Sequence, residues 1–297
     1  MDTEFTASLK SVETENKIDL YFYRRIGYQI ARVLKHTRIT PNMVTVFSIF
    51  VGAGAGFMFY YDNLICNLTG IMLLVSANIL DCVDGQLARM TGIKSKIGRI
   101  LDGLAGDIWF LLIYVCLALR LTYTYGTAWF FVPAVLSALS HIIQASITDY
   151  YKTLHLFFVS KEAGKEFQSK QQVKVQQQTL KAGEGKFLYA LYERYTGMQE
   201  KLTPVLQKLL NSLQLKYGNE IPQDVRLNFR QKSCQLMKII DLLTFNGRTI
   251  VLFLVILSGY VWVYFVYEII ILNCVLCVSI RKHEKMCQQI FHKITGI

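Results

Sequence analysis

The chain has 297 residues, of which 53% are hydrophobic and 18% charged, and its formal net charge is +11 at pH 7. The hydrophobic residues come in long blocks with few charges, which argues against an ordinary soluble domain and favours a polytopic membrane protein. The positive charges lie between these blocks, so we attribute them to membrane orientation and expect no nucleic-acid partner. The seven cysteines show no spacing typical of a disulfide framework.

The first predicted element is an amphipathic helix near the N-terminus. Residues 18–34 mix Leu, Ile and aromatic residues with Arg24, Arg25 and Arg32. This stretch carries too many charges to cross a bilayer, so we expect it to lie on the cytoplasmic membrane surface. Thr40 and Pro41 then suit the N-cap and the first position of a spanning helix.

Six spanning helices are predicted, because six apolar segments are each close to the ~20 residues that cross about 30 Å of hydrocarbon. The connections 24–38, 89–99 and 281–293 carry five, four and four Lys or Arg, whereas the opposite turns carry only Arg120. The positive-inside rule then places both termini on the cytoplasmic side. The predicted spans are residues 42–61, 67–90, 99–121, 127–150, 239–258 and 260–280.

Residues 151–238 interrupt the membrane pattern. They hold fifteen Lys and Arg, a Gln-rich run and helical stretches with Leu, Tyr and Met at helical spacing. We predict a cytoplasmic helical insertion that packs on the membrane core or on a partner subunit. The fold class is therefore an all-α polytopic membrane protein. Its predicted parts are residues 1–150 with the amphipathic helix and four spans, 151–238 as the insertion, and 239–297 with two spans and a cytoplasmic tail.

Carboxylates gather where the second and third spans meet, at the cytoplasmic side. The stretch from Asp81 to Asp107 reads DCVDGQLARMTGIKSKIGRILDGLAGD. Asp81 and Asp84 share one helical face, and Asp102 opens a second helix that can face the first. A carboxylate at the centre of a membrane helix costs roughly 2.5 to 3.5 kcal/mol, so several together require a cation. Hard oxygen ligands suit Mg²⁺ or Mn²⁺, and paired ions of this kind serve phosphoryl chemistry.

The same stretch resembles the signature DxxDGxxARx8GxxxDxxxD of the CDP-alcohol phosphotransferases, integral membrane enzymes of phospholipid synthesis. With the Thr-Pro-Asn opening of the first span, the resemblance extends over about residues 18–150. The pattern departs at its last position, where Gly106 stands instead of the fourth Asp and Asp107 follows one residue later. The seven matching residues are Asp81, Asp84, Gly85, Ala88, Arg89, Gly98 and Asp102.

The resemblance implies displacement at phosphorus. The hydroxyl of an acceptor alcohol attacks a CDP-linked donor, and CMP leaves. Two divalent ions, Mg²⁺ or Mn²⁺, are expected to neutralise the charge that develops on the diphosphate. We assign Asp81, Asp84 and Asp102 to these ions. In the family the fourth Asp is the general base and also contacts a metal, and we assign both roles to Asp107.

Asp107 is rotated about 100° from position 106 in a regular helix. A π-bulge at Gly103 and Gly106 would bring it back toward Asp102. Asp149 and Asp241, at other cytoplasmic helix ends, are alternative bases.

Small and basic residues of the signature are expected to bind the donor, as the family uses them. Gly85 and Ala88 let the diphosphate and cytidine approach the helix backbone, and Arg89 reaches a phosphate or pairs with a carboxylate. Gly98 loosens the start of the following helix. The basic residues around it suit an anionic headgroup: Lys94, Lys96 and Arg99.

Other polar residues lie inside the later spans. Arg248 suits an anionic acceptor group or pairs with Asp241, and Glu268 has no obvious partner in the sequence and is expected to be protonated. We interpret His141 as a packed polar residue rather than a ligand. In the first span, the glycines at 52, 54 and 56 indicate close helix packing.

The favoured function is transfer of a phosphatidyl group from CDP-diacylglycerol to an inositol-type acceptor, because basic residues surround the site. Transfer from a soluble CDP-alcohol to a lipid acceptor remains an alternative, as does a catalytically inactive membrane scaffold. A transporter would distribute its acidic residues through the bilayer depth, whereas these gather at one end. The expected partners are the CDP-linked donor, the acceptor alcohol and membrane lipids, and a homodimer is expected from the resemblance alone.

Overall fold

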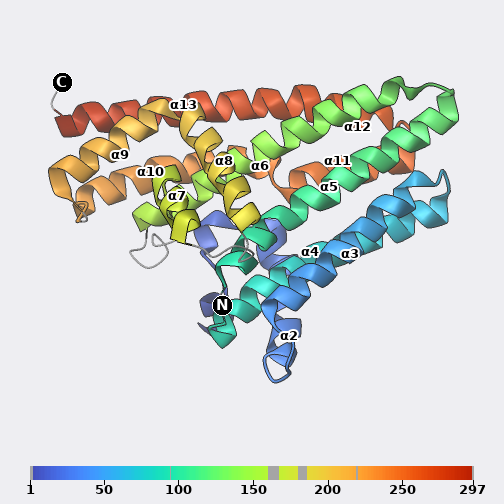
Figure 1. The fold of residues 1–297 in the computed structure, drawn as a ribbon, viewed down its shortest axis with the longest axis horizontal. Coiled ribbons are helices and arrows are strands. Elements are labelled where there is room, and N and C mark those ends of the chain that lie inside the picture. The colour runs from blue at the N-terminus through green and yellow to red at the C-terminus, as the bar shows by residue number, and fades with distance from the viewer. Residues whose placement is uncertain (1–2, 94, 160–166, 180–185, 219, 296–297) are drawn as a thin grey trace. The chain divides into compact units, whose positions relative to one another are not determined.

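The computed structural model describes residues 3–93, 95–159, 167–179, 186–218 and 220–295. Within these residues every regular element is a helix, which confirms the predicted all-α fold (Figure 1). The helices are α1 Thr3–Ser8, η1 Val12–Thr14, η2 Asp19–Tyr23, α2 Arg24–Leu34, α3 Pro41–Tyr60, α4 Leu64–Thr91, α5 Lys96–Tyr125, η3 Ala128–Phe130, α6 Phe131–Val159, α7 Lys170–Thr179, α8 Lys186–Leu202, α9 Pro204–Tyr217, α10 Gln223–Ile240, η5 Asp241–Leu243, α11 Phe245–Ser258, α12 Trp262–Val266, η6 Tyr267–Ile271 and α13 Leu272–Thr295.

Six helical stretches among the described residues are long and apolar enough to cross a membrane, which confirms the predicted number. The chain is thus a multi-pass integral membrane protein. The last two stretches, of 36 and 34 residues, are longer than the predicted fifth and sixth spans. They take in the end of the predicted insertion and part of the predicted tail. The six stretches are Pro41–Tyr60, Leu64–Thr91, Gly98–Tyr125, Ala128–Val159, Gln223–Ser258 and Trp262–Thr295.

The chain divides into two compact units. The first comprises Met1–Ile143 and Thr244–Asn273, and the second comprises Gln144–Leu243 and Cys274–Ile297. The three-part organisation expected from the sequence, with its boundaries after residues 150 and 238, stays a prediction.

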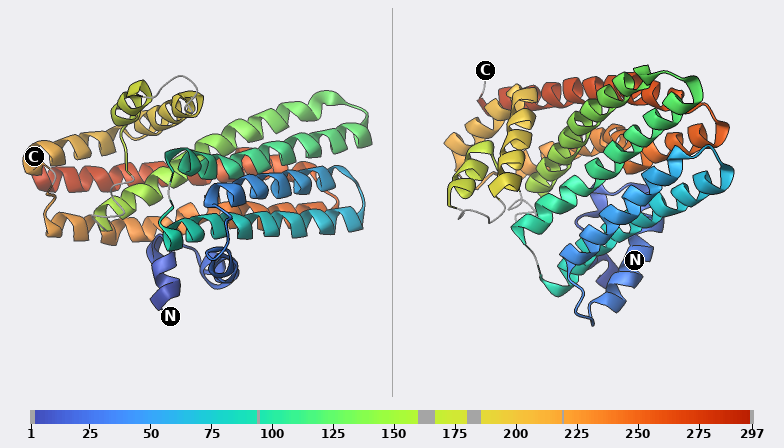
Figure 2. Two further views of the ribbon diagram at one scale, coloured as in Figure 1. Left: turned by 60° about the horizontal axis from the view of Figure 1, so that its bottom comes forward. Right: turned by 45° about the vertical axis from the view of Figure 1, so that its right-hand side comes forward.

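In the first unit, α3 lies beside α4 and packs against α5 (Figures 1 and 2). Glycines allow the close approach of α3 to α5. A Cβ atom on Gly52 would lie 2.3 Å from Trp109 Cδ1, and one on Gly56 would lie 3.2 Å from the Ile113 nitrogen. Gly54 lies against α4 instead, where a Cβ atom would meet Leu73 at an ordinary 3.6 Å. The predicted role in close helix packing is confirmed for Gly52 and Gly56.

Helix α3 begins as its sequence predicts. The Thr40 side chain accepts a hydrogen bond from the Met43 nitrogen, and Pro41 occupies the first turn. Because proline lacks the N–H that would have no helical partner there, this start is favourable. The prediction for this helix start is confirmed.

The segment before α3 packs on α4 within the same unit. Residues 19–34 are continuously helical, as η2 followed by α2. Gln86 Nε2 on α4 donates to Ser8 Oγ and to the Arg24 carbonyl, both at 3.1 Å. A Cβ atom on Gly27 would lie 3.0 Å from Cys82 Cβ, so α2 approaches α4 closely at this point. The helix is confirmed, and its location on the membrane surface stays a prediction.

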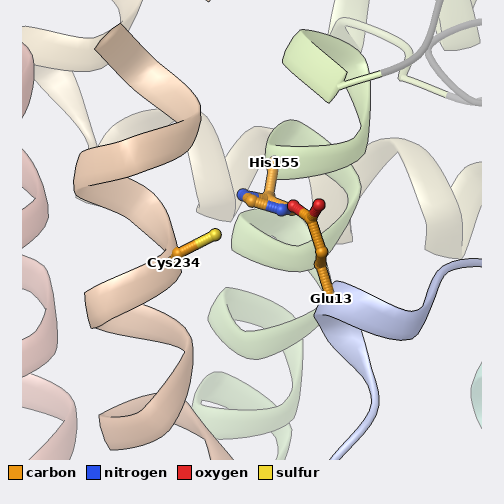
Figure 3. Close-up of side chains that lie close together, drawn as sticks. All are labelled: Glu13, His155 and Cys234. Carbon is orange, nitrogen blue, oxygen red and sulfur yellow. The ribbon is translucent and has the colours of Figure 1, made fainter. Parts of the chain in front are cut away.

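The second unit contains α7 to α10, the second half of α6 and most of α13. Its polar contacts join these helices. Glu284 on α13 accepts from the Val205 and Leu206 nitrogens at 2.7 and 3.2 Å and thereby caps the start of α9. His155 on α6, which Figure 3 shows together with Cys234 on α10, lies 2.7 Å from Ser233 Oγ. The described part of the insertion is therefore mostly helical, and its cytoplasmic location stays a prediction.

Candidate metal centre

Three acidic side chains converge where α4 ends and α5 begins. Asp81 and Asp84 come from the last turns of α4, and Asp102 comes from the second turn of α5. One carboxylate oxygen from each lies within 4.8 Å of the others. The i, i+3 spacing on α4 is what puts the first two on one face. The structure therefore brings together three of the four residues that the sequence indicated as metal ligands.

Helix ends hold this geometry. Gly92, with φ of 71°, ends α4 in the left-handed conformation that glycine adopts most readily. Ser95 caps α5, because its hydroxyl accepts from the Gly98 nitrogen at 2.8 Å. Asn42 at the start of α3 donates to the same hydroxyl at 3.2 Å.

Gly98 has a different role from the one expected. A Cβ atom at this position would lie only 2.1 Å from Asn42 Oδ1. Glycine thus lets the first turns of α3 and α5 approach each other, and its role in loosening the start of α5 stays a prediction. Lys94, which was expected to bind an anionic headgroup, lies outside the described residues, as does the Lys96 side chain.

Asp84 is the most informative of the three carboxylates. The residue is only 3% exposed, and its Oδ2 accepts from Thr45 Oγ1 on α3 at 2.5 Å. Its Oδ1 is buried and has no hydrogen-bond partner among the described residues. A buried polar atom of this kind costs roughly 1 to 3 kcal/mol unless something satisfies it. Three clustered carboxylates with one unsatisfied buried oxygen fit a hard divalent cation such as Mg²⁺ or Mn²⁺.

Arginines border the carboxylate group. The Arg24 guanidinium on α2 lies 3.0 Å from Glu15 Oε1. Burial opposes its charge, but the nearby Cys82, Glu15 and Asp81 outweigh burial and raise the pKa of Arg24 above its ordinary value. The residue is therefore a fixed cation beside Asp81. Sequence analysis had treated Arg24 only as a charge on the membrane surface.

The donor-binding residues of the signature lie on the last three turns of α4. Arg89 Nε donates to the Ser8 carbonyl at 2.5 Å. A Cβ atom on Gly85 would lie 3.1 Å from Arg89 Nη2, so the space beside this glycine is bordered by the guanidinium. Ala88 is partly buried. Their roles toward a donor stay predictions.

Asp107 is not a member of the three-carboxylate group. Its Oδ1 lies 3.4 Å from Nε2 of His141 on α6. Helix α5 is α-helical at every residue, so the π-bulge considered for Gly103 and Gly106 is absent, and that expectation is wrong. The assignment of Asp107 as general base and metal ligand stays a prediction.

Two glycines separate Asp102 from Asp107 around the circumference of α5. At about 100° per residue, Gly106 and Gly103 fall between the two carboxylates. A Cβ atom on either glycine would meet nothing within 4 Å. The surface of α5 between Asp102 and Asp107 is therefore open at these two positions.

His141 is a packed polar residue, as predicted, and it contacts residues of α5. Its Nδ1 lies 2.9 Å from the Tyr114 hydroxyl, and its ring packs against Phe110 at 4.7 Å. The residue is 5% exposed. No spacing rule relates positions 107 and 141, because they meet only after two helices have folded against each other.

The alternative bases Asp149 and Asp241 belong to the second unit, where Asp241 lies 3.8 Å from Lys152 Nζ.

A second ionic group lies in the first unit, away from these carboxylates in sequence. Arg248 Nη1 on α11 lies 2.5 Å from Glu268 Oε2 on η6, and both residues are at most 2% exposed. The expectation that Glu268 has no partner is therefore wrong. The two residues are twenty positions apart around a turn, so helical periodicity did not relate them.

The chain was compared with known proteins. Residues 38–174 match the family model described as CDP-alcohol phosphatidyltransferase. Archaetidylinositol phosphate synthase of Pyrococcus horikoshii is 43% identical over 74 residues, which are 25% of this chain and 38% of that protein.

Two further relatives are more distant. An uncharacterized protein of Aquifex aeolicus is 31% identical over 81 residues, or 27% of this chain and 40% of that protein. CDP-diacylglycerol–glycerol-3-phosphate 3-phosphatidyltransferase of Cereibacter sphaeroides is 24% identical over 111 residues, or 37% and 49%. The chain thus spans less than half the length of each of these curated relatives.

Proposed function

We propose that this chain, which belongs through residues 38–174 to the CDP-alcohol phosphatidyltransferase family, transfers a phosphatidyl group from a CDP-linked lipid to an alcohol and releases CMP. The observation that carries the proposal is the carboxylate group of Asp81, Asp84 and Asp102, with the unsatisfied buried Oδ1 of Asp84. Such a group has little structural value on its own, because three like charges repel one another.

The three carboxylates would hold Mg²⁺ or Mn²⁺, and we expect two ions. When bound, these cations neutralise the charge that develops on the diphosphate oxygens. Thr45 fixes Asp84 through the hydrogen bond to its Oδ2. The space beside Gly85, bordered by Arg89, would admit the diphosphate close to α4.

Asp107 is the proposed general base. The acceptor would lie over Gly103 and Gly106, with its hydroxyl toward Asp107. A bond forms between the acceptor oxygen and phosphorus while the bond from phosphorus to the CMP oxygen breaks, and the hydroxyl proton passes to the Asp107 carboxylate. A carboxylate is needed here because Gly106 supplies none.

For the acceptor we propose an inositol-type polyol, and inositol phosphate in particular. The relative from Pyrococcus horikoshii is an archaetidylinositol phosphate synthase by name. The fixed cation at Arg24 and the guanidinium of Arg89 beside the site suit a phosphorylated acceptor or the donor diphosphate. We further propose that the site and both termini face the cytoplasm and that the chain forms a homodimer, as the charge distribution and the family resemblance suggest.

The test is release of CMP by the purified protein in lipid nanodiscs. CDP-diacylglycerol would be supplied with Mg²⁺ or Mn²⁺ and with inositol, inositol phosphate or glycerol phosphate. We expect release that requires both the metal and one acceptor and that is lost in Asp84→Asn. The matched control is Asp224→Asn, which removes an exposed carboxylate of α10. No release with this donor, nor with soluble CDP-alcohols and diacylglycerol, would favour the inactive scaffold.

A further inference from the structure

Three polar side chains from α5 and α6 lie in contact within the first unit. Asp107 and Tyr114 lie two turns apart on α5, and His141 of α6 touches both. Its Nε2 lies 3.4 Å from Asp107 Oδ1 and its Nδ1 lies 2.9 Å from the Tyr114 hydroxyl. Neither the family signature nor the proposed function gives His141 a task.

The hydrogen-bonding capacity of imidazole limits how His141 can pair with Asp107. A neutral ring has one N–H donor and one acceptor nitrogen. An ionised Asp107 can only accept, so the His141 tautomer that pairs with it is the one with its N–H at Nε2. The Tyr114 hydroxyl, which also hydrogen-bonds with Glu268 and Tyr264, contacts Nδ1 of the same ring.

Packing holds the imidazole in this position. The ring lies 4.7 Å from Phe110, which comes one turn after Asp107 on the same face of α5. His141 is 5% exposed and Tyr114 is 1% exposed, so the contact between these two residues is shielded from water. A carboxylate with a contact of this kind is restricted in its rotamers, whereas a solvated one is free to turn.

We infer that His141 is a positioning residue of the proposed transfer and holds Asp107 in the orientation that lets it serve for the carboxylate absent at Gly106. The inference rests on the proposed function. His141 acts through Asp107 and does not itself touch a substrate. The buried histidine thus lies against the carboxylate that follows the position of the missing signature Asp.

Position 106 offers a test that separates positioning from packing. A Cβ atom there meets nothing within 4 Å, so Gly106→Asp can restore the carboxylate of the signature. If His141 serves only to orient Asp107, the restored carboxylate makes both residues dispensable. If His141 merely supports the fold, its loss stays harmful in the presence of Asp at 106.

The experiment measures kcat and KM for CMP release in the wild type, His141→Ala, Gly106→Asp and the double variant. We expect kcat of His141→Ala to fall about 10²-fold, with KM for the donor unchanged. The double variant should return to within about tenfold of Gly106→Asp alone. His141→Gln, which keeps an N–H donor, should lose less than His141→Ala. The matched control on α6 is Ser137→Ala, which should be neutral because the Ser137 hydroxyl makes no hydrogen bond among the described residues.

A double-mutant cycle of His141→Ala and Asp107→Asn, measured on kcat, gives a second, independent readout. If His141 acts through Asp107, His141→Ala should slow Asp107→Asn no further, so the two losses are not additive. Additive losses of kcat would overturn the inference. Full activity of His141→Ala would do the same. So would a kcat of the His141→Ala, Gly106→Asp double variant that stays as low as that of His141→Ala. If Gly106→Asp is itself inactive, the cycle decides alone.

Failure of the proposed function gives a different result. Neither the wild type nor Gly106→Asp would then release CMP from any CDP-linked donor, and the positioning role would fall with the reaction. The contact itself is judged separately by the thermal unfolding of Asp107→Asn, His141→Ala and their combination. Additive shifts in Tm would show that the two side chains do not interact.

Discussion

The first unit contains two ionic groups of opposite character. The group at the ends of α4 and α5 consists of like charges, Asp81, Asp84 and Asp102, with one buried oxygen unsatisfied. The pair of Arg248 and Glu268 combines opposite charges at 2.5 Å, with both side chains buried. In the pair each charge has its own counter-charge, whereas the three carboxylates have one fixed cation beside them, Arg24. The carboxylate group is therefore suited to a ligand, and the pair is suited to holding α11 against η6.

The largest expected effect separates function from stability at the carboxylate group. Asp84→Asn or Asp102→Asn should lower CMP release by at least about 10³-fold, because the charge that holds the metal is reduced. The Tm should not fall, since the substitution relieves repulsion among three carboxylates. Parallel activity and unfolding measurements check this, and a large drop in Tm would contradict it.

The buried pair should behave in the opposite way. Glu268→Gln leaves Arg248 buried without its counter-charge and should destabilise the fold by about 3 to 5 kcal/mol. Replacing both residues by Met should cost less than the single change, because no buried charge then remains. Denaturant unfolding in detergent measures both. If Glu268→Gln unfolds like the wild type, the pair does not hold these helices.

Metal should stabilise the carboxylate group specifically. At a free Mg²⁺ or Mn²⁺ concentration of about 100 times Kd, the wild type should gain about 2.7 kcal/mol relative to protein treated with chelator. Asp84→Asn should lose most of this gain, and Glu268→Gln should keep it. An equal gain in all three proteins would indicate nonspecific binding.

Helix packing beside the site gives a smaller effect with a matched control. Gly52→Ala should destabilise the first unit by about 1 to 3 kcal/mol, since its Cβ atom would overlap Trp109. Gly54→Ala, two residues away, has room for its methyl group and should be nearly neutral. The Tm values of the two variants, measured side by side, test this interpretation, and equal values would contradict it.

The smallest effect concerns the support of Asp84. Thr45→Val removes the hydroxyl that donates to Asp84 Oδ2 and keeps the shape of the side chain. We expect stability to fall by about 1 kcal/mol. The metal concentration that gives half-maximal CMP release should rise several-fold, because Asp84 is less well oriented. An unchanged metal requirement would mean that Thr45 does not position Asp84.

Local spacing in the sequence predicted the parts of the molecule that depend on local geometry. The six apolar stretches, the capped start of α3 and the shared face of Asp81 and Asp84 all follow from helical periodicity or chain length. The contacts of His141 with Asp107 and of Arg248 with Glu268 join different helices, so no single-helix pattern contains them. The close approach of Asn42 to Gly98 was not predicted for the same reason, since Asn42 is on α3.

The contacts of Gln86 and Arg89 also bear on how this protein can be dissected and expressed. Their partners, Ser8 and Arg24, precede the segment of residues 38–174 that matches the family. On the far side of that segment, Asn246 donates to Asn16 and Asp19 at 3.1 and 2.8 Å. A fragment cut at the limits of sequence similarity would lose all of these contacts. During synthesis, Asn16 and Asp19 are made long before α11, so their contacts with Asn246 form only late in translation.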